Sequence, residues 1–494
     1  MPARLLLLAV IVLIRTETFG DERISRRPNV LLIMADDLRN DLGCYGHSEV
    51  LSPRIDGLAA HSTQFERAYC QQAVCNPSRA SMFTGRRPDQ LQIWDLPTHF
   101  RASNPDVVTL PQYFKQQGYF TQDVGKIFHN WGHDIQGDPV SWSVPAVMHF
   151  NTHGRDTPLV NGQLPPNLAN DPKCFCFDVP DDAYFDGRIA TQAIDALQER
   201  RDAAQPFFLA VGFWKPHSPF NAPKSYWDLY DRGRISMPKN PEWPTDAPRI
   251  AWHDGRELLG YPQTRTLSSE SIREIRHGYL ANISYLDAQV GRVLDELQQL
   301  GLSDSTIVVF TSDHGYHLGE QTLWAKTSNF ELDARVPLLI STPGQSTGAQ
   351  TMALAELIDL FPTLTDLCAL PTPDGLAGMS LKPVLDDPDA TVKSAALTQH
   401  PRPAYYDRAP DKTPTTMGYS LRIEPFRYVE WRDWKTGEVA ARELYDHHAD
   451  PDETRNLAVD PDHAADIARC TAELSRLHPI VRPGWTPTLP KSDD

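Results

Sequence analysis

The residues best suited to chemistry stand together in the segment Cys75-Asn76-Pro77-Ser78-Arg79. Proline fits the first turn of a helix and glycine is a usual end, so we expect a short helix from just after Cys75 to near Gly85. The backbone N–H groups at its start favour an anion, and Arg79, one turn along, can direct its guanidinium onto the same oxyanion. An arbitrary cysteine is usually a buried thiol or half of a disulfide, but this context favours an anion-handling site.

Acidic residues follow two apolar runs. Residues 28–35 lead into Asp36 and Asp37, and residues 306–311 lead through Ser312 into Asp313 and His314. Continuous apolar runs predict strands buried on both faces, and open α/β sheets bind ligands at the carboxyl ends of such strands. Three carboxylates gathered at that edge need a cation, and flexible oxygen ligation favours calcium over magnesium.

Basic residues follow two further predicted strands, 120–124 and 206–212. Taken singly, each would be interpreted as a surface charge or a satisfied core histidine. Their neighbours form three recognisable stretches, Gly-Lys-x-Phe-His, Lys-Pro-His-x-Pro-Phe and Trp-Ala-Lys-x-Ser-Asn-Phe. These stretches contain Lys126, His129, Lys215, His217 and Lys326.

The order of predicted elements indicates a doubly wound α/β sheet with helices on both faces. Apolar residues recur every three or four positions over 272–297, which predicts a long helix with a capping box at Ser271 and Glu274 and an end at Gly301. A further helix is expected over 354–370. We divide the chain into a signal peptide (1–20), a catalytic domain (21–390) and a small C-terminal α+β domain (391–494). The regions 130–180 and 215–267 are expected to be long loops that form the walls of a cleft.

Composition excludes several classes of protein. The 494 residues carry a formal net charge of −17, which argues against a nucleic-acid partner and against an electrostatic membrane anchor. An apolar run of about ten residues after Arg4 is typical of a secretory signal and too short for a stable membrane span, so we expect a secreted or periplasmic protein. The seven cysteines show no zinc spacing.

The pattern C-x-P-S-R followed by A-S-x-x-T-G resembles the signature of the type I sulfatases. The Lys126–His129 spacing and Asp313-His314-Gly315 are similar to the iduronate-2-sulfatase branch, whereas most sulfatases have one residue fewer between lysine and histidine and asparagine in place of His314. The similarity covers nearly all of the mature chain and is weakest in the loops at 130–180 and 220–265.

The resemblance implies an alkaline-phosphatase-like fold and a Cys75 that a formylglycine-generating enzyme oxidises to formylglycine, whose hydrate is the nucleophile. It also implies a calcium ion held by Asp36, Asp37, Cys75, Asp313 and His314. Arg79, Lys126 and Lys326 would stabilise the sulfate oxygens, His217 would protonate the leaving oxygen, and His129 would help to regenerate the aldehyde. Lys215 and Tyr316 are assigned to substrate binding. The implied substrate is a sulfated oligo- or polysaccharide, with the 2-O-sulfate of a uronic acid as the target and Lys126, Lys215 and Lys326 sharing its carboxylate.

Two alternatives stay open at this point. One is a phosphodiesterase or phosphonate hydrolase with the same fold and aldehyde, which a comparison of aryl sulfate with aryl phosphate hydrolysis would separate. The other is a non-catalytic, calcium-dependent glycan-binding protein. The intact set of Cys75, Arg79, Lys126, His217 and Lys326 argues against the second alternative.

Overall fold

The structure is a computed structural model that describes residues 27–129, 137–149, 174–259, 267–404 and 414–478. The predicted signal peptide (1–20) lies outside these ranges. In the described residues, no helix has both the length and the apolar character needed to cross a membrane.

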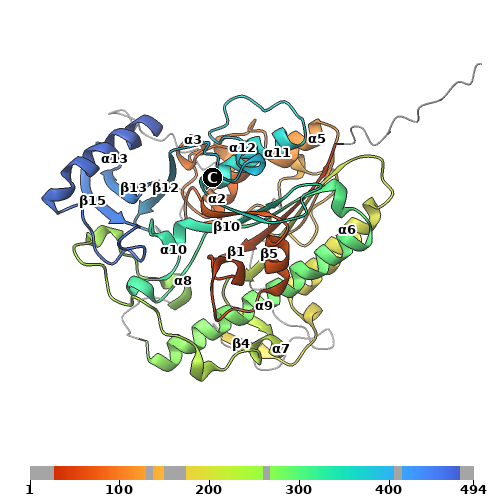
Figure 1. The fold of residues 1–494 in the computed structure, drawn as a ribbon, viewed down its shortest axis with the longest axis horizontal. Coiled ribbons are helices and arrows are strands. Elements are labelled where there is room, and N and C mark those ends of the chain that lie inside the picture. The colour runs from red at the N-terminus through yellow and green to blue at the C-terminus, as the bar shows by residue number, and fades with distance from the viewer. Residues whose placement is uncertain (1–26, 130–136, 150–173, 260–266, 405–413, 479–494) are drawn as a thin grey trace, which may run out of the picture.

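A seven-stranded sheet forms the centre of the molecule, in the order β11-β2-β10-β7-β1-β5-β3 (Figure 1). Within it, β10 runs antiparallel to both neighbours, whereas the other paired strands are parallel. The predicted α/β class is therefore confirmed, with a mixed sheet. The strands span Asn29–Asp36 (β1), Thr63–Tyr69 (β2), Phe120–Gly125 (β3), Phe207–Pro216 (β5), Thr306–Ser312 (β7), Arg335–Ser341 (β10) and Ala349–Glu356 (β11).

Helices cover both faces of this sheet because successive strand residues point to opposite sides. On one face, Leu31 and Ile33 of β1 belong to a core shared with α6 and α9. On the other, Leu32 and Met34 belong to a core shared with α2, α5 and α11. The main helices span Pro53–Ala59 (α1), Cys75–Thr84 (α2), Leu110–Gln116 (α5), Phe185–Arg200 (α6), Ser269–Gln299 (α9), Leu360–Leu367 (α11) and Lys382–Asp386 (α12).

Two helix predictions need correction. Helix α9 is capped by Ser268, whose side chain accepts the backbone N–H of Ser271, so the cap lies three residues before the predicted box. Gly301 follows the helix end with φ of 69°, as expected. The helix predicted over 354–370 is shorter, because residues up to Glu356 pair with β2 and α11 starts only at Leu360.

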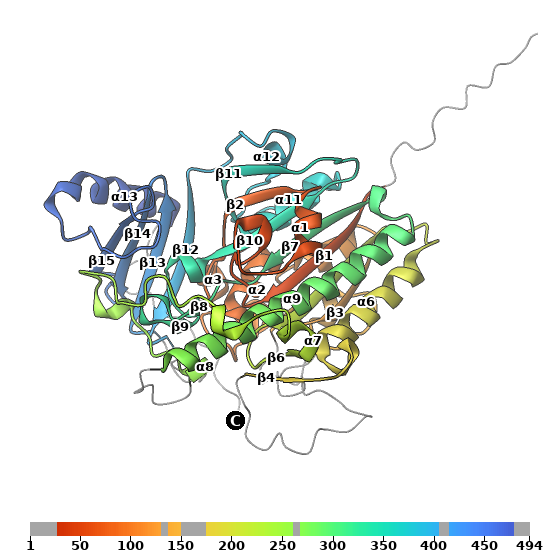
Figure 2. The same ribbon diagram turned by 60° about the horizontal axis from the view of Figure 1, so that its bottom comes forward.

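The C-terminal part forms a separate four-stranded antiparallel sheet, β12-β13-β14-β15, against which α13 packs (Figure 2). Its first strand, β12, was not expected, and it lies against the segment that precedes Cys75: Thr398 Oγ1 donates to the Cys70 carbonyl at 2.6 Å. The predicted domain boundary at 390/391 stays a prediction. The elements span Ala395–Arg402 (β12), Thr416–Ile423 (β13), Phe426–Asp433 (β14), Val439–Asp446 (β15) and Ala464–Leu477 (α13).

Shorter elements occupy the connections, including the region 215–267 that we expected to be loop throughout. They are α3 (Pro88–Leu91), α4 (Phe100–Ser103), α7 (Lys224–Trp227), α8 (Arg256–Leu259), α10 (Glu331–Ala334), β4 (Cys174–Phe177), β6 (Phe220–Pro223), β8 (His317–Leu318) and β9 (Trp324–Ala325).

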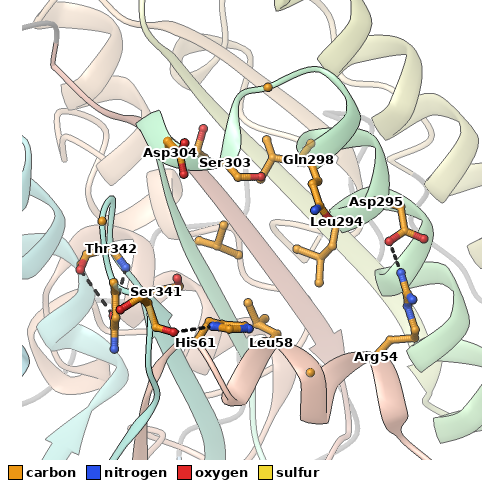
Figure 3. A pocket seen from close by; sticks show the side chains of 18 of the residues that line it. Arg54, Leu58, His61, Leu294, Asp295, Gln298, Ser303, Asp304, Ser341 and Thr342 are labelled. Carbon is orange, nitrogen blue, oxygen red and sulfur yellow. Dashed lines mark hydrogen bonds and ion pairs between the residues drawn. The ribbon is translucent and has the colours of Figure 1, made fainter. Parts of the chain in front are cut away.

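A cavity of about 700 Å³ opens at the end of the sheet where strand β7 begins and the antiparallel strand β10 ends (Figure 3). Its lining pairs Arg54 with Asp295, and His61 contacts the Ser346 carbonyl. The carboxyl ends of β1 and β7 lie at the opposite end of these strands, so this cavity is remote from the residues predicted to do chemistry.

Candidate active site

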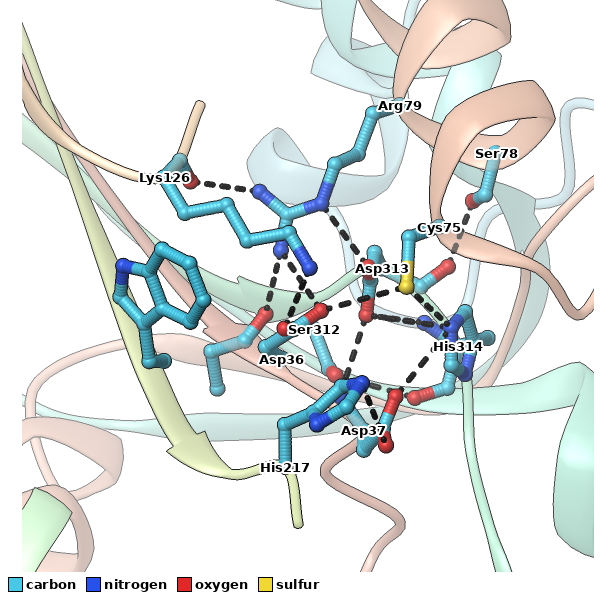
Figure 4. A network of polar contacts seen from close by, with 12 residues as sticks. Asp36, Asp37, Cys75, Ser78, Arg79, Lys126, His217, Ser312, Asp313 and His314 are labelled. Carbon is cyan, nitrogen blue, oxygen red and sulfur yellow. Dashed lines mark hydrogen bonds and ion pairs between the residues drawn. The ribbon is translucent and has the colours of Figure 1, made fainter. Parts of the chain in front are cut away.

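The acidic residues come together because β1 and β7 are parallel neighbours. Ala35 pairs with Ser312, so Asp36 and Asp37 leave the sheet beside Asp313 and His314 (Figure 4). Asp37 has a φ of 65°, a conformation that aspartate tolerates better than most residues, and its backbone N–H donates to Asp313 Oδ1 at 3.2 Å. All four side chains are buried. The convergence expected from the sequence is therefore present.

Helix α2 delivers Cys75 to the same point. The helix has the predicted bounds, with Gly85 following it at φ of 64°, and its ten residues are all buried. Cys75 Sγ lies 3.5 Å from Asp36 Oδ1, 3.4 Å from His314 Nε2 and 3.6 Å from Lys326 Nζ. Burial and then Asp36 raise the pKa of this thiol well above its usual value, so the side chain is a thiol near neutral pH.

The donor atoms of this cluster fit a divalent cation. One ligand atom each from Asp36, Cys75, Asp313 and His314 lies within 4.8 Å of the others, and Asp37 and His217 meet Cys75 in the same way. Asp37 Oδ2 is buried with no hydrogen-bond partner in the described residues, and burial raises the pKa of Asp37 to about 7 although Lys326 opposes the shift. A cation bound among these carboxylates would contact Asp37 Oδ2 and stabilise the ionised form of Asp37.

Arg79 organises the carboxylates. Its Nε donates to Asp313 Oδ2 at 2.8 Å and one terminal nitrogen donates to Asp36 Oδ1 at 3.2 Å. Its remaining N–H groups donate to the carbonyl oxygens of Ala35, Lys126 and Ile127. Since a guanidinium has five N–H donors, these five bonds occupy it completely. The expected contact of Arg79 with the sulfate oxygens stays a prediction; in this structure its N–H groups are directed to two carboxylates and three carbonyls.

Two lysines flank the cysteine. Lys126 Nζ lies 2.5 Å from Asp36 Oδ2, and Lys326 Nζ lies 2.8 Å from Asp37 Oδ1. The residues on either side of Lys326 have positive φ values, 68° for Ala325 and 93° for Thr327. The second is unusual for a β-branched residue, and such strain clusters at functional sites. The backbone thus fixes the direction of Lys326 into the cluster.

Glu257 of α8 completes the cluster and was missed from the sequence. Its Oε1 lies 2.8 Å from Lys326 Nζ and 3.1 Å from His217 Nε2. Burial opposes its ionisation, but Lys326 and His217 lower the pKa of Glu257 well below its usual value. Burial and then Lys326 lower the pKa of His217, while Glu257 opposes that shift. The sequence offers no signal for Glu257, because it lies in a proline-rich region without a motif.

The other predicted residues are placed as follows. His129 is buried, its ring has no hydrogen-bond partner in the described residues, and burial and then Lys126 lower its pKa well below the usual value. Lys215 is directed to Asn221 and to the Pro219 carbonyl. Tyr316 is fully buried and its ring stacks on Tyr279 at 5.7 Å. Both side chains are buried, and their assignment to substrate binding stays a prediction.

Comparisons with known proteins identify the family. The family model described as "Sulfatase" matches residues 28–369, and the model "N-sulphoglucosamine sulphohydrolase, C-terminal" matches residues 319–479. Together with the geometry, the first match shows that this chain belongs to the sulfatase family and is a sulfuric ester hydrolase.

Individual relatives agree with this assignment. The chain is 36% identical over 507 residues to iduronate 2-sulfatase of Mus musculus, with 88% of this chain and 91% of that protein covered. It is 30% identical to choline-sulfatase of Rhizobium meliloti, with 90% and 85% covered.

Solved structures support the alkaline-phosphatase-like fold. One is a protein in complex with its substrate D-glucosamine-2-N,6-O-disulfate (TM-score 0.72, 22% identity, 93% and 99% covered). Another is a phosphonate monoester hydrolase from Silicibacter pomeroyi (TM-score 0.73, 24% identity, 91% and 94% covered). At these identities the likeness concerns the fold alone.

Proposed function

We propose that this sulfatase hydrolyses the 2-O-sulfate ester of a uronic acid in a sulfated glycan, after export from the cytoplasm. The observation that carries the proposal is the meeting of the Cys75 thiol with Asp36, His314 and Lys326 at 3.4–3.6 Å, at the carboxyl ends of β1 and β7. The 36% identity to iduronate 2-sulfatase, over most of both chains, supports the uronate as the sugar.

Two groups would complete the site. Oxidation of Cys75 by a formylglycine-generating enzyme would supply an aldehyde whose hydrate is the nucleophile. A bound calcium ion would neutralise the carboxylates of Asp36, Asp37 and Asp313, with His314 as a further ligand, and would act as a Lewis acid.

The remaining residues have separate roles in this proposal. Arg79 keeps Asp36 and Asp313 in place, and the ammonium groups of Lys126 and Lys326 hold the charge that develops on the sulfate oxygens. His217 would donate a proton from Nε2 to the leaving sugar oxygen from its doubly protonated form, which Glu257 at 3.1 Å favours. His129 is neutral near pH 7 because its pKa is lowered, so a ring nitrogen can accept the proton that is released when sulfate departs.

A panel of defined oligosaccharides tests the substrate. We expect kcat/KM, measured by released sulfate, to be highest for a terminal 2-O-sulfated uronate and lower for 6-O-sulfated hexosamine and for simple aryl sulfates. The Cys75→Ala variant serves as the inactive control, because it cannot be oxidised to the aldehyde. A better rate on 6-O-sulfated hexosamine would contradict the uronate proposal, and faster cleavage of a phosphate or phosphonate ester would contradict the sulfate preference.

A further inference from the structure

A buried arginine beside the active site lacks a carboxylate partner. Arg402, the last residue of β12, is 7% exposed and forms no ion pair within the described ranges. Its N–H groups donate to the carbonyls of Ile250 at 2.7 Å, Ala251 at 2.6 Å, Thr327 at 3.1 Å and Pro401 at 3.1 Å, and its guanidinium lies 4.8 Å from the Trp431 ring centroid. Burial lowers the pKa of Arg402 to about 10. By contrast, Arg79, Lys126 and Lys326 each contact at least one carboxylate.

Two buried histidines accompany this arginine, and each has an unused ring nitrogen. His253 Nδ1 accepts the backbone N–H of Gly255 at 3.2 Å, so the proton of the neutral ring is on Nε2. That Nε2–H donor has no partner among the described residues, although His253 is only 5% exposed. His400 is fully buried, its Nδ1 lies 3.0 Å from the Pro401 carbonyl and 3.1 Å from Arg402, and its Nε2 also has no partner there. Buried polar groups are rarely left in this state unless a ligand completes them.

Arg402, His253 and His400, here called the basic group, are connected to the residues around Cys75 by two chain segments. Arg402 donates to the carbonyl of Thr327, the residue after Lys326, whose ammonium reaches Cys75. His253 lies four residues before Glu257, which contacts the same ammonium. The hydroxyl of Thr327 is buried and also without a hydrogen-bond partner in the part of the chain that the structure describes.

The lysines that we first assigned to the sugar carboxylate are engaged elsewhere. Lys126 and Lys326 hold Asp36 and Asp37, and Lys215 is directed to Asn221. A uronate has one carboxylate in addition to its sulfate, and this second anion needs a cation and N–H donors of its own. The basic group offers both: the charge of Arg402, which no carboxylate contacts within the described residues, and the Nε2–H of His253, which has no partner there.

We propose that His253, His400 and Arg402 form an anion subsite that binds the carboxylate of the sugar whose sulfate lies at Cys75. This proposal rests on the proposed function, because it needs a substrate that carries a carboxylate next to the sulfate ester. The carboxylate accepts the Nε2–H of His253 and the Nε2–H of His400 in the tautomer whose Nδ1 accepts from Arg402, and Arg402 supplies the charge.

The test is a thermodynamic cycle between enzyme and substrate. Wild type and His253→Asn are compared on a 2-O-sulfated iduronate disaccharide and on the same compound with its carboxyl group reduced to an alcohol. Asparagine keeps an acceptor near the position of Nδ1 but removes the Nε2–H. The same replacement at His61, in the cavity at the opposite end of the sheet (Figure 3), is the matched control.

We expect wild type to prefer the carboxylate substrate by roughly 10- to 100-fold in kcat/KM, the range expected for hydrogen bonds to a charged group. His253→Asn should lose most of this preference, chiefly through KM, and His61→Asn should retain it. His253→Gln, which restores an N–H donor near Nε2, should recover part of the preference. His400→Asn gives a second, independent loss, and melting temperatures check that each variant is folded.

Each outcome has one meaning. Equal losses on both substrates in folded His253→Asn and His400→Asn overturn the subsite, as does a wild type that is indifferent to carboxyl reduction, while the sulfatase assignment stands in both cases. A further comparison uses disaccharides whose second sugar is N-acetyl- or N-sulfo-glucosamine. If the preference of the wild type depends on this N-substituent and not on the iduronate carboxylate, the subsite binds a second sulfate and the carboxylate proposal is overturned. A wild type that cleaves aryl sulfate but neither disaccharide overturns the proposed function and the subsite with it.

Discussion

Replacing Arg79 with lysine keeps the positive charge but removes the fork that joins two carboxylates. The guanidinium is fully buried and makes five hydrogen bonds, two to Asp36 and Asp313 and three to backbone carbonyls. An ammonium has three donors, so at least two of these acceptors lose their partner. At about 1–3 kcal/mol for each buried acceptor left unpaired, we expect a destabilisation of about 2–6 kcal/mol.

The effect on function follows from the same contacts. Groups that orient metal ligands typically contribute roughly 10- to 100-fold in metal affinity or activity. We therefore expect the calcium concentration that supports half-maximal activity to rise by roughly this factor in Arg79→Lys. The assay is kcat/KM in calcium buffers, together with the urea midpoint followed by tryptophan fluorescence.

Arg87→Lys is the matched control, because Arg87 also forms a two-bond contact with a carboxylate, at 2.8 and 3.1 Å from Glu356, outside the cysteine cluster. It should lower the urea midpoint slightly and leave the calcium dependence unchanged. If Arg79→Lys retained the calcium dependence and stability of the wild type, the positioning role inferred from its five bonds would be refuted.

Three other perturbations test the site and its surroundings. Asp37→Asn should abolish turnover although the protein stays folded, and exhaustive chelation of the wild type should do the same. Activity in protein that elemental analysis shows to be metal-free would contradict the need for a bound cation. Glu257 lies 2.8 Å from Lys326 and would compete with a sulfate for this ammonium group. Glu257→Gln removes the negative charge, so inorganic sulfate should inhibit roughly tenfold more strongly, or about 1.4 kcal/mol, and weaker inhibition would refute this competition. Asp333 raises the pKa of His317 above its ordinary value of 6.5, although burial of the ring opposes this shift. The ion pair therefore stabilises the fold fully below about pH 6.5, and this stabilisation is lost as the pH rises through the pKa of His317 in the folded state. The melting-temperature difference between wild type and His317→Gln should therefore shrink as the pH is raised above about 6.5, and a constant difference would contradict the assignment.

Local signals were sufficient for the elements that carry the acidic residues and the cysteine. Uniform apolar runs identified β1 and β7, and a proline and a glycine delimited α2. The reversed direction of β10 was not predictable, because strand direction depends on which edge of the sheet the chain returns to. Strand β12 was missed, since its polar residues and Pro401 give no alternating pattern and its partner is β13.

The same division applies to the site. Motif residues such as Asp36, Cys75 and Lys326 were found because their spacing is recognisable within one segment. Glu257, His253 and Arg402 were not found, because they come from two distant segments that only tertiary packing brings to the cluster. The guanidinium of Arg79 was located correctly, but its saturation by five acceptors depends on carbonyl groups that no sequence pattern reveals.

Mass spectrometry of the tryptic peptide Ala68–Arg79 from active protein, produced with a formylglycine-generating enzyme, tests the central claim most directly. The peptide contains Cys70, a second fully buried cysteine, as an internal control. We expect Cys75 to carry an aldehyde in place of its thiol and to react with a hydrazide probe, while Cys70 is alkylated as an ordinary thiol. Fully active protein in which both residues are intact thiols would contradict the account.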